Sequence, residues 1–247
     1  MATQKGILPI EGTLGGVNFY YRKGKAVARK AGGGFNGKAI KTKSSMVRVR
    51  ENSSEFGNCS KVKSAFRIAL SPFLNYYKDG TLHGRMMRLF QEIKKFDHSS
   101  MRGSRTVGNG ILTAEGMNLF KNFAFTPKCN IAIMVPMNVN YDSTSCTYDV
   151  VDFDISLVSF PKSATHLELQ FGVLGVDFET PFYKLFMAAP LALEKGIEVD
   201  GFTMIPDILP DSGLHRFAFV GVTFYQELNG MKYSLKEDGT VGIKCIL

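Results

Sequence analysis

The spacing of apolar residues predicts two helices in the first half of the chain. Between residues 47 and 97, apolar residues recur every three or four positions, as they do along one side of a helix. The first stripe ends at Ser71-Pro72, and the second follows a turn at Lys78-Asp79-Gly80. The stripes are Phe56, Cys59, Val62, Phe66, Ala69 and Leu70, then Leu82, Met86, Leu89, Phe90, Ile93 and Phe96. We expect the opposite face of the second helix to be exposed and basic, with Arg85, Arg88, Lys94 and Lys95.

The next segment, residues 98–110, is predicted to be a linker, because Ser, Gly and polar residues dominate it. We expect a short helix over about residues 112–122 to close the helical region.

From residue 124 the apolar period changes to two, as in strands with one buried face. Turn clusters such as Asn138–Ser145 separate the candidates, and Asn229-Gly230 is the clearest hairpin turn. The predicted strands are Asn130–Val135, Thr147–Ser156, His166–Phe178, Phe182–Leu191, Gly201–Ile205, Arg216–Glu227, Lys232–Leu235 and Thr240–Ile246. Short strands with little helix between them favour an antiparallel β-sandwich of the jelly-roll or immunoglobulin-like kind.

The N-terminal region is predicted to be an extended arm that contains a β-hairpin. Val17–Arg22 alternates, a turn follows at Lys23-Gly24-Lys25, and Ala26–Arg29 returns. Gly32-Gly33-Gly34 then breaks regular structure, and residues 35–45 are predicted to be a mobile basic loop. The fold class is therefore α+β in three regions: the arm over 1–46, helices over 47–123 and the sandwich over 124–247.

Charge is divided unevenly along the chain. Residues 1–110 hold 21 Lys and Arg against 6 Asp and Glu, whereas residues 111–247 hold 9 against 16. The segment from Gly12 to Arg50 alone has ten cations and no acid. A basic half can bind a polyanion, or it can meet the acidic half of a second copy. Both halves could also be solvated surfaces that keep the protein soluble.

Catalytic patterns are incomplete. Gly32–Lys38 fits the glycine and lysine spacing of a phosphate-binding loop, but Ala39 stands where Ser or Thr would hold magnesium. His166 and Glu168 resemble the HxE pair of zinc deaminases, yet the PCxxC partner is missing. Asp152 and Asp154, with Asp149 nearby, could bind a cation, although such a pair more often lies on the solvent-exposed face of an edge strand. We therefore expect no enzyme activity, no cofactor and no metal.

The four cysteines are expected to be reduced thiols, because they form neither CxxC pairs nor metal-ligand spacings. We expect no signal peptide, because the first residues contain no apolar run, and we expect no membrane span, because no apolar run is long enough. We expect a soluble protein made in the cytoplasm. A final location in an extracellular or particle assembly would require another export route.

Several separated blocks carry a resemblance. QKGI, EGTLGGVNFYYRKGKAVARKAGG, RENSSEFGNCSKVKSAFR, RTVGNG and the C-terminal FYQELNGMKYSL occur in this order. The chain thereby resembles an uncharacterised protein family from Bacteroidota. The resemblance covers most of the chain and implies no activity, cofactor or catalytic residue.

The arm, the hairpin and the sheet edges together favour a self-assembling structural subunit of a filament, tube or shell. A two-stranded hairpin is marginally stable alone, so it must pack on its own body or on a neighbouring copy. We expect apolar contacts from Leu14, Val17, Phe19 and Tyr21, and contacts to acids of the next copy from Arg22, Lys23, Lys25, Arg29 and Lys30.

The alternative is a nucleic-acid-binding protein. In that reading the same cations contact phosphates together with Lys38, Lys41, Lys43, Arg48 and Arg50, while aromatic residues of the hairpin stack on bases. A lectin-like or receptor-binding sandwich is a third possibility, which rests on fold class alone.

Overall fold

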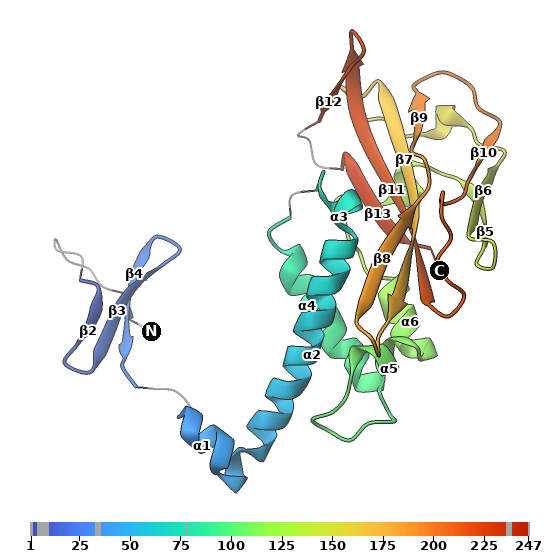
Figure 1. Ribbon diagram of the computed structural model, residues 1–247. Helices are drawn as coiled ribbons and strands as arrows, with labels where there is room; N and C mark the ends of the chain where they lie inside the picture. Colours follow the sequence, from blue (N-terminus) through green and yellow to red (C-terminus); the bar gives the residue numbers. More distant parts are fainter. Residues whose placement is uncertain (1, 4–9, 33–35, 78, 236–238, 247) are drawn as a thin grey trace. The chain divides into compact units, whose positions relative to one another are not determined.

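The fold was analysed in a computed structural model, which describes residues 2–3, 10–32, 36–77, 79–235 and 239–246 (Figure 1). The protein mixes helix and strand in nearly equal shares, 31% and 32%, and every strand pairing is antiparallel among these residues. The α+β class is therefore confirmed. The chain divides into two compact units, Met1–Glu51 and Asn52–Leu247, which we call the first unit and the body. The predicted helical and strand regions thus share one unit.

The first unit contains a small sheet, the arm sheet, instead of a lone hairpin. Its strands are β1 (Ala2–Thr3), β2 (Gly12–Leu14), β3 (Val17–Arg22) and β4 (Lys25–Lys30), in the order β1-β4-β3-β2. The predicted hairpin of β3 and β4 is confirmed. Two-residue turns at Gly15-Gly16 and Lys23-Gly24 connect β2, β3 and β4, and all four turn residues have positive φ.

A short helix follows the arm sheet where a mobile loop was predicted. Helix α1 (Gly37–Thr42) and the turn η1 (Ser44–Met46) occupy most of the segment. The side chain of Asn36 accepts hydrogen bonds from the backbone N–H groups of Lys38 and Ala39, which caps α1. The loop prediction was therefore wrong over residues 37–45, because a capping asparagine outweighed the flanking glycines. Gly33, Gly34 and Phe35 lie outside the described residues.

The two predicted long helices are present. They are α2 (Val47–Ala69) and α4 (Leu82–Ile93), and α4 continues as η2 (Lys94–Phe96). The first of them ends before Ser71-Pro72, as predicted, and Pro72 lies in the first turn of the short helix α3 (Ser71–Leu74). The remaining helices of this region are α5 (Val107–Ile111) and α6 (Ala114–Lys121). The predicted basic face of the second helix is wrong for Lys94, which is buried.

The strands of the body form two antiparallel sheets. The large sheet has the order β12-β11-β7-β8, with β13 beside β11 and β9 beside β7, and it curls into a half-barrel. The small sheet has the order β10-β6-β5. The strands are β5 (Asn138–Asp142), β6 (Thr147–Val151), β7 (His166–Asp177), β8 (Phe182–Met187), β9 (Leu191–Glu194), β10 (Gly201–Met204), β11 (His215–Leu228), β12 (Met231–Ser234) and β13 (Val241–Cys245).

Several predictions for this half of the chain needed correction. The predicted strand Thr147–Ser156 ends at Val151 as β6, and Ser156 lies in a 3-10 turn instead. Asn130–Val135 contains helix α7 (Ile131–Met134), because the Asn130 side chain caps it. β5 lies in what was predicted to be a turn cluster, and the turn begins only at Asp142, whose carboxylate accepts from the Thr144 and Ser145 N–H groups. The predicted strand Phe182–Leu191 ends at Met187 as β8, and after Pro190 a separate strand, β9, begins at Leu191.

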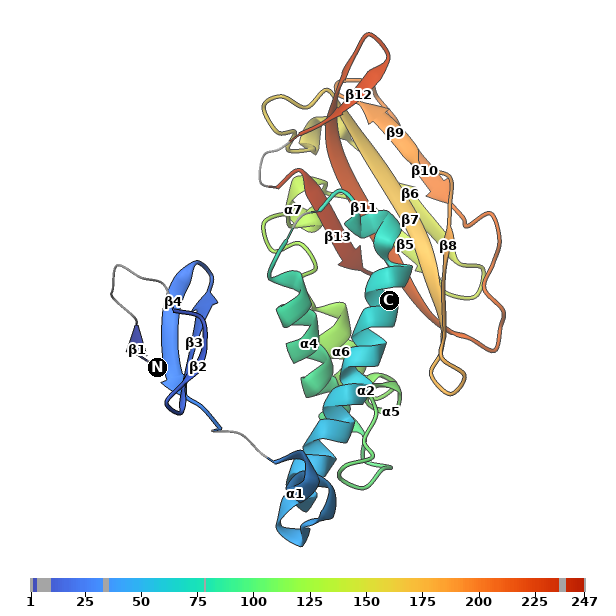
Figure 2. The ribbon, with the colours of Figure 1, turned by 60° about the vertical axis from the view of Figure 1, so that its left-hand side comes forward.

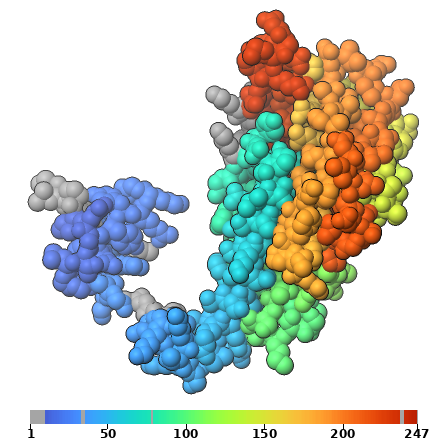
Figure 3. All heavy atoms as spheres, in the orientation of Figure 1, coloured from blue at the N-terminus to red at the C-terminus, as the bar shows by residue number. Residues whose placement is uncertain are grey.

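The large sheet has a core on each face. Along β7, Leu167, Leu169, Phe171 and Val173 belong to the core against the small sheet, whereas Leu174 and Val176 belong to the core against the helices. The helices α2 to α6 and the small sheet therefore cover opposite faces of the large sheet (Figure 2). In the space-filling view α2 lies directly against β8, where the rings of Phe66 and Tyr183 are 5.5 Å apart (Figure 3).

The two glycines of the RTVGNG block, Gly108 and Gly110, lie where the chain packs too closely for a larger side chain. Val107–Gly110 belongs to α5, and a Cβ atom added at Gly110 would lie 2.2 Å from the carbonyl oxygen of Ile93. A Cβ atom at Gly108 would lie 2.7 Å from the Cβ atom of Phe178. Small residues are therefore required where α5 crosses the end of α4.

A methyl group at Gly110 is expected to destabilise the body. Because the clash is with backbone, Gly110→Ala should cost about 1–3 kcal/mol or more in the free energy of unfolding. Gly84→Ala is the matched control, since it lies in α4 with nothing within 4 Å of an added Cβ atom. Urea denaturation of both variants tests this, and equal stability of the two would contradict the packing described here.

Candidate assembly interface

The arm sheet has one apolar and one polar face. In the register of β2, β3 and β4, Leu14 pairs with Val17 and Phe19 pairs with Ala28, so these side chains share a face. Tyr21 pairs with Ala26 on the same face. The four apolar residues predicted to contact a neighbour, Leu14, Val17, Phe19 and Tyr21, are therefore brought together on one side of the sheet.

The predicted cations of the arm are divided between its two faces. Arg22 pairs with Lys25, and Arg29 pairs with Asn18, on the polar face. The Arg29 guanidinium lies 5.5 Å from the centre of the Tyr20 ring, also on that face. Lys30 pairs with Val17 and lies on the apolar face, while Lys23 occupies the turn. The apolar face is thus bordered by positive charge.

The described residues of the first unit form no core of their own. None of the residues 10–32 and 36–51 is buried, and Leu14 and Tyr21 are 66% and 46% exposed. Exposed apolar side chains that are grouped on one face are typical of contact surfaces. The apolar face of the arm sheet is consequently a candidate contact surface.

The cations of the nucleic-acid alternative lie on α1, directly after it and in the first turns of α2. Lys38 and Lys41 lie on α1 three residues apart, and Lys43 follows its end, all exposed. Arg50 donates hydrogen bonds to the carbonyl oxygens of Ile40 and Lys43, and Arg48 forms an ion pair with Glu51 at 2.9 Å. Arg48 and Arg50 therefore already have partners within the same segment of the chain.

The body holds a buried ionic cluster that the sequence pattern did not reveal. Glu55 of α2 accepts hydrogen bonds from the Gly103 N–H at 2.8 Å and from Arg105 at 2.8 and 3.0 Å, and it also accepts from Lys94 Nζ. Hydrogen bonds from Arg105 lower the pKa of Glu55 to about 2, although burial acts in the opposite direction. Each carboxylate oxygen accepts two hydrogen bonds, so Glu55 ties α2 to Lys94 and to the segment 103–105.

A second buried carboxylate anchors the segment predicted to be a linker. Asp97 accepts from the Thr106 N–H at 2.8 Å and from Ser99 and Ser100 N–H groups. Burial acts to raise the pKa of Asp97, but these hydrogen bonds outweigh it and hold the pKa well below its usual range. The linker prediction was therefore wrong. The RENSSEFG and RTVGNG blocks contact each other through the ion pair of Glu55 with Arg105, so the recurrence of both blocks was the available signal.

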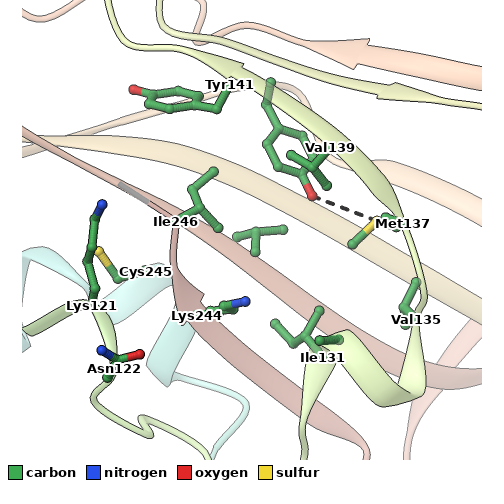
Figure 4. A pocket seen from close by; sticks show the side chains of 13 residues that line it. Lys121, Asn122, Ile131, Val135, Met137, Val139, Tyr141, Lys244, Cys245 and Ile246 are labelled. Carbon is green, nitrogen blue, oxygen red and sulfur yellow. Dashed lines mark hydrogen bonds between the residues drawn. The ribbon is translucent and has the colours of Figure 1, made fainter. Parts of the chain in front are cut away.

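Two grooves open in the strand half of the body. The first, which we call the β13 groove, has a volume of about 580 Å³ and lies among α7, β5 and the end of β13 (Figure 4). Its walls combine apolar and polar groups, and Lys121 and Lys244 in its lining are exposed. The Tyr148 hydroxyl donates to Met137 Sδ at 3.7 Å inside it.

The second groove, which we call the β10 groove, has a volume of about 270 Å³. It lies between β10 and the segment that joins β8 to β9. Its lining is Ala188, Ala189, Pro190, Leu191, Phe202, Thr203, Met204, Ile205 and Asp207. Only Asp207 among these carries a charge, so this groove pairs apolar walls with negative charge.

The HxE pair lies beside Tyr225. His166 stacks on the Tyr225 ring, and Glu168 forms an ion pair at 2.8 Å with Lys232, whose Nζ lies 4.8 Å from the centre of the same ring. Asp154 caps the turn η3 (Ile155–Leu157), and its neighbour Asp152 has a positive φ. In the described part of the chain no group of three His, Cys, Asp or Glu is placed to hold a metal ion.

Comparison with known proteins adds no assignment, since no family model, curated protein or solved structure matches the chain. Within the described residues, none of the helices combines the length and apolar character needed to cross a bilayer.

Proposed function

We propose that this protein is a self-assembling structural subunit whose arm docks on a neighbouring copy. The observation that carries the proposal is the arm sheet, which gathers Leu14, Val17, Phe19 and Tyr21 on one face while none of its residues 10–32 is buried. An apolar face that is left exposed in this way is typical of a surface that contacts a partner.

The energetics favour a contact that combines several kinds of interaction. Burying each apolar side chain contributes on the order of 1.5–3 kcal/mol. Association costs roughly 4–15 kcal/mol in lost freedom of motion, so the four anchors alone leave the contact marginal. Opposite charges and strand pairing at a free sheet edge would supply the remainder.

The contact would be heterologous, because the basic arm of one copy would meet an acidic part of another. Contacts of this kind close into rings or continue into filaments. We also propose that the strand half of the body is a β-sandwich, since a continuous apolar core lies between its large and small sheets.

Static light scattering on a sizing column tests the proposal. We expect the purified full-length protein, after nuclease treatment, to have a mass well above 27.3 kDa and a protein-like ratio of absorbance at 260 and 280 nm. A monomer at all concentrations would contradict it.

The same experiment addresses nucleic-acid binding, which the exposed Lys38, Lys41 and Lys43 support. If that is the function, the protein should be monomeric and bind polyanions with a steep dependence on salt concentration.

A further inference from the structure

The two grooves of the body differ in the charge of their lining residues. This difference indicates which of them is the better binding site for the basic arm of a second copy. Lys121 and Lys244 at the β13 groove have no ion-pair partner among the described residues. A basic arm would meet like charge there. The β10 groove has Asp207 in its lining instead, so opposite charges would meet.

The surroundings of the β10 groove are also acidic. The segment from residue 196 to 213 contains no Lys, Arg or His. Its acids are Glu198, Asp200, Asp207 and Asp211, all exposed, and none forms an ion pair within the described chain. These carboxylates are therefore available to a cationic partner.

Apolar side chains accompany these acids. Ile205, Ile208 and Leu209 follow β10 directly, and Ile208 is 67% exposed. Exposed apolar residues that are grouped beside a groove are typical of contact surfaces. The arm sheet has the same combination with the opposite sign of charge.

Each of the two surfaces also includes an edge strand, which has a neighbouring strand on one side only. Among the described strands, β10 pairs only with β6, and β2 of the arm sheet pairs only with β3. A strand with one neighbour can hydrogen-bond to an added strand along its open side. The two edges can therefore supply backbone hydrogen bonds in addition to side-chain contacts.

Resting on the proposed assembly, we infer that the surface around β10 of one copy receives the arm sheet of the next. The apolar face with Leu14 and Phe19 packs on Ile205, Ile208 and Leu209. The arm cations pair with the acids on either side, and β2 lies along β10. The contact is head to tail, since the arm and the β10 surface are different parts of the chain.

Cross-linking between two variants tests this assignment. One variant carries Leu14→Cys and the other Ile208→Cys, both at exposed positions. The four native cysteines are buried, and burial raises the pKa of the Cys59 and Cys129 thiols to about 11, so they should react slowly with a short bismaleimide. In a mixture of the variants we expect dimers linked between positions 14 and 208, identified by mass spectrometry.

The matched control replaces Ile208→Cys with Val139→Cys at the β13 groove, which is 40% exposed. We expect roughly tenfold more hetero-linked dimer with the cysteine at position 208. An assembled protein that links position 14 to 139, or to neither, would overturn this inference and leave the proposed function standing. A protein that does not assemble would overturn both.

Charge reversal gives an independent readout. Asp207→Lys with Asp211→Lys should abolish most of the assembled fraction, because like charges then meet. Lys121→Asp with Lys244→Asp reverses the other groove and should leave the assembled fraction unchanged or larger. All four positions are exposed, so the fold should tolerate the changes. The opposite ranking of the two double variants would contradict the assignment.

Discussion

Replacing Glu55 with glutamine is expected to lower the free energy of unfolding of the body by about 3–5 kcal/mol. The change preserves shape but removes the charge that compensates buried Lys94 and the Arg105 guanidinium. A buried cation without a partner is costly, whereas the packing of the side chain is retained. Urea denaturation at neutral pH measures the difference.

The control for this prediction is Glu92→Gln. Glu92 forms an ion pair with Lys95 at 2.6 Å, but both side chains are exposed, so its loss should cost less than about 1 kcal/mol. If Glu55→Gln were as mild as the control, the ionic cluster would not hold the segment 97–106 in place.

The same carboxylate predicts a pH dependence. The pKa of Glu55 is lowered from 4.5 to about 2, so the stability that its charge contributes is present above pH 4.5 and is lost as the pH falls towards 2. A shift of this size corresponds to about 3 kcal/mol. The difference in stability between the native protein and Glu55→Gln should therefore shrink between pH 4.5 and 2. A constant difference over this range would contradict the assignment.

Placing aspartate on the apolar face of the arm sheet is expected to abolish assembly. Leu14→Asp combined with Phe19→Asp puts two charges where the proposed contact is apolar, and desolvating either charge would cost several kcal/mol. This exceeds the apolar gain of about 1.5–3 kcal/mol for each anchor. Dynamic light scattering should therefore show a single-chain size.

Thr13→Asp is the matched control, since Thr13 pairs with Asn18 on the polar face of the same strand. It adds a charge next to Leu14 without touching the apolar face. We expect assembly to persist in this variant. Loss of assembly in both variants would mean that added negative charge alone, and not the apolar face, is responsible.

The long elements were predictable because their pattern extends over many residues. β7 and β11 are rich in apolar residues over 12 and 14 positions, and α4 keeps one apolar stripe through three turns. Short elements were harder to predict. In α7 a single capping side chain, that of Asn130, decided between helix and strand.

The contacts of the ionic cluster could not be predicted from local pattern. Glu55 lies 39 residues before Lys94 and 50 before Arg105, so their meeting depends on how α2, α4 and the following segment pack. The shared face of the arm anchors was easier to predict, since Val17, Phe19 and Tyr21 alternate. Leu14 joins them because a two-residue turn at Gly15-Gly16 pairs it with Val17.

Removal of residues 1–34 followed by sedimentation velocity tests the central claim most directly. Both apolar cores of the body consist of residues from Cys59 onwards, so the shortened chain should fold. We predict that the full-length protein sediments as a multimer and the shortened one as a folded monomer. Unchanged assembly after the deletion, or a full-length protein that sediments as a monomer, would contradict docking through the arm.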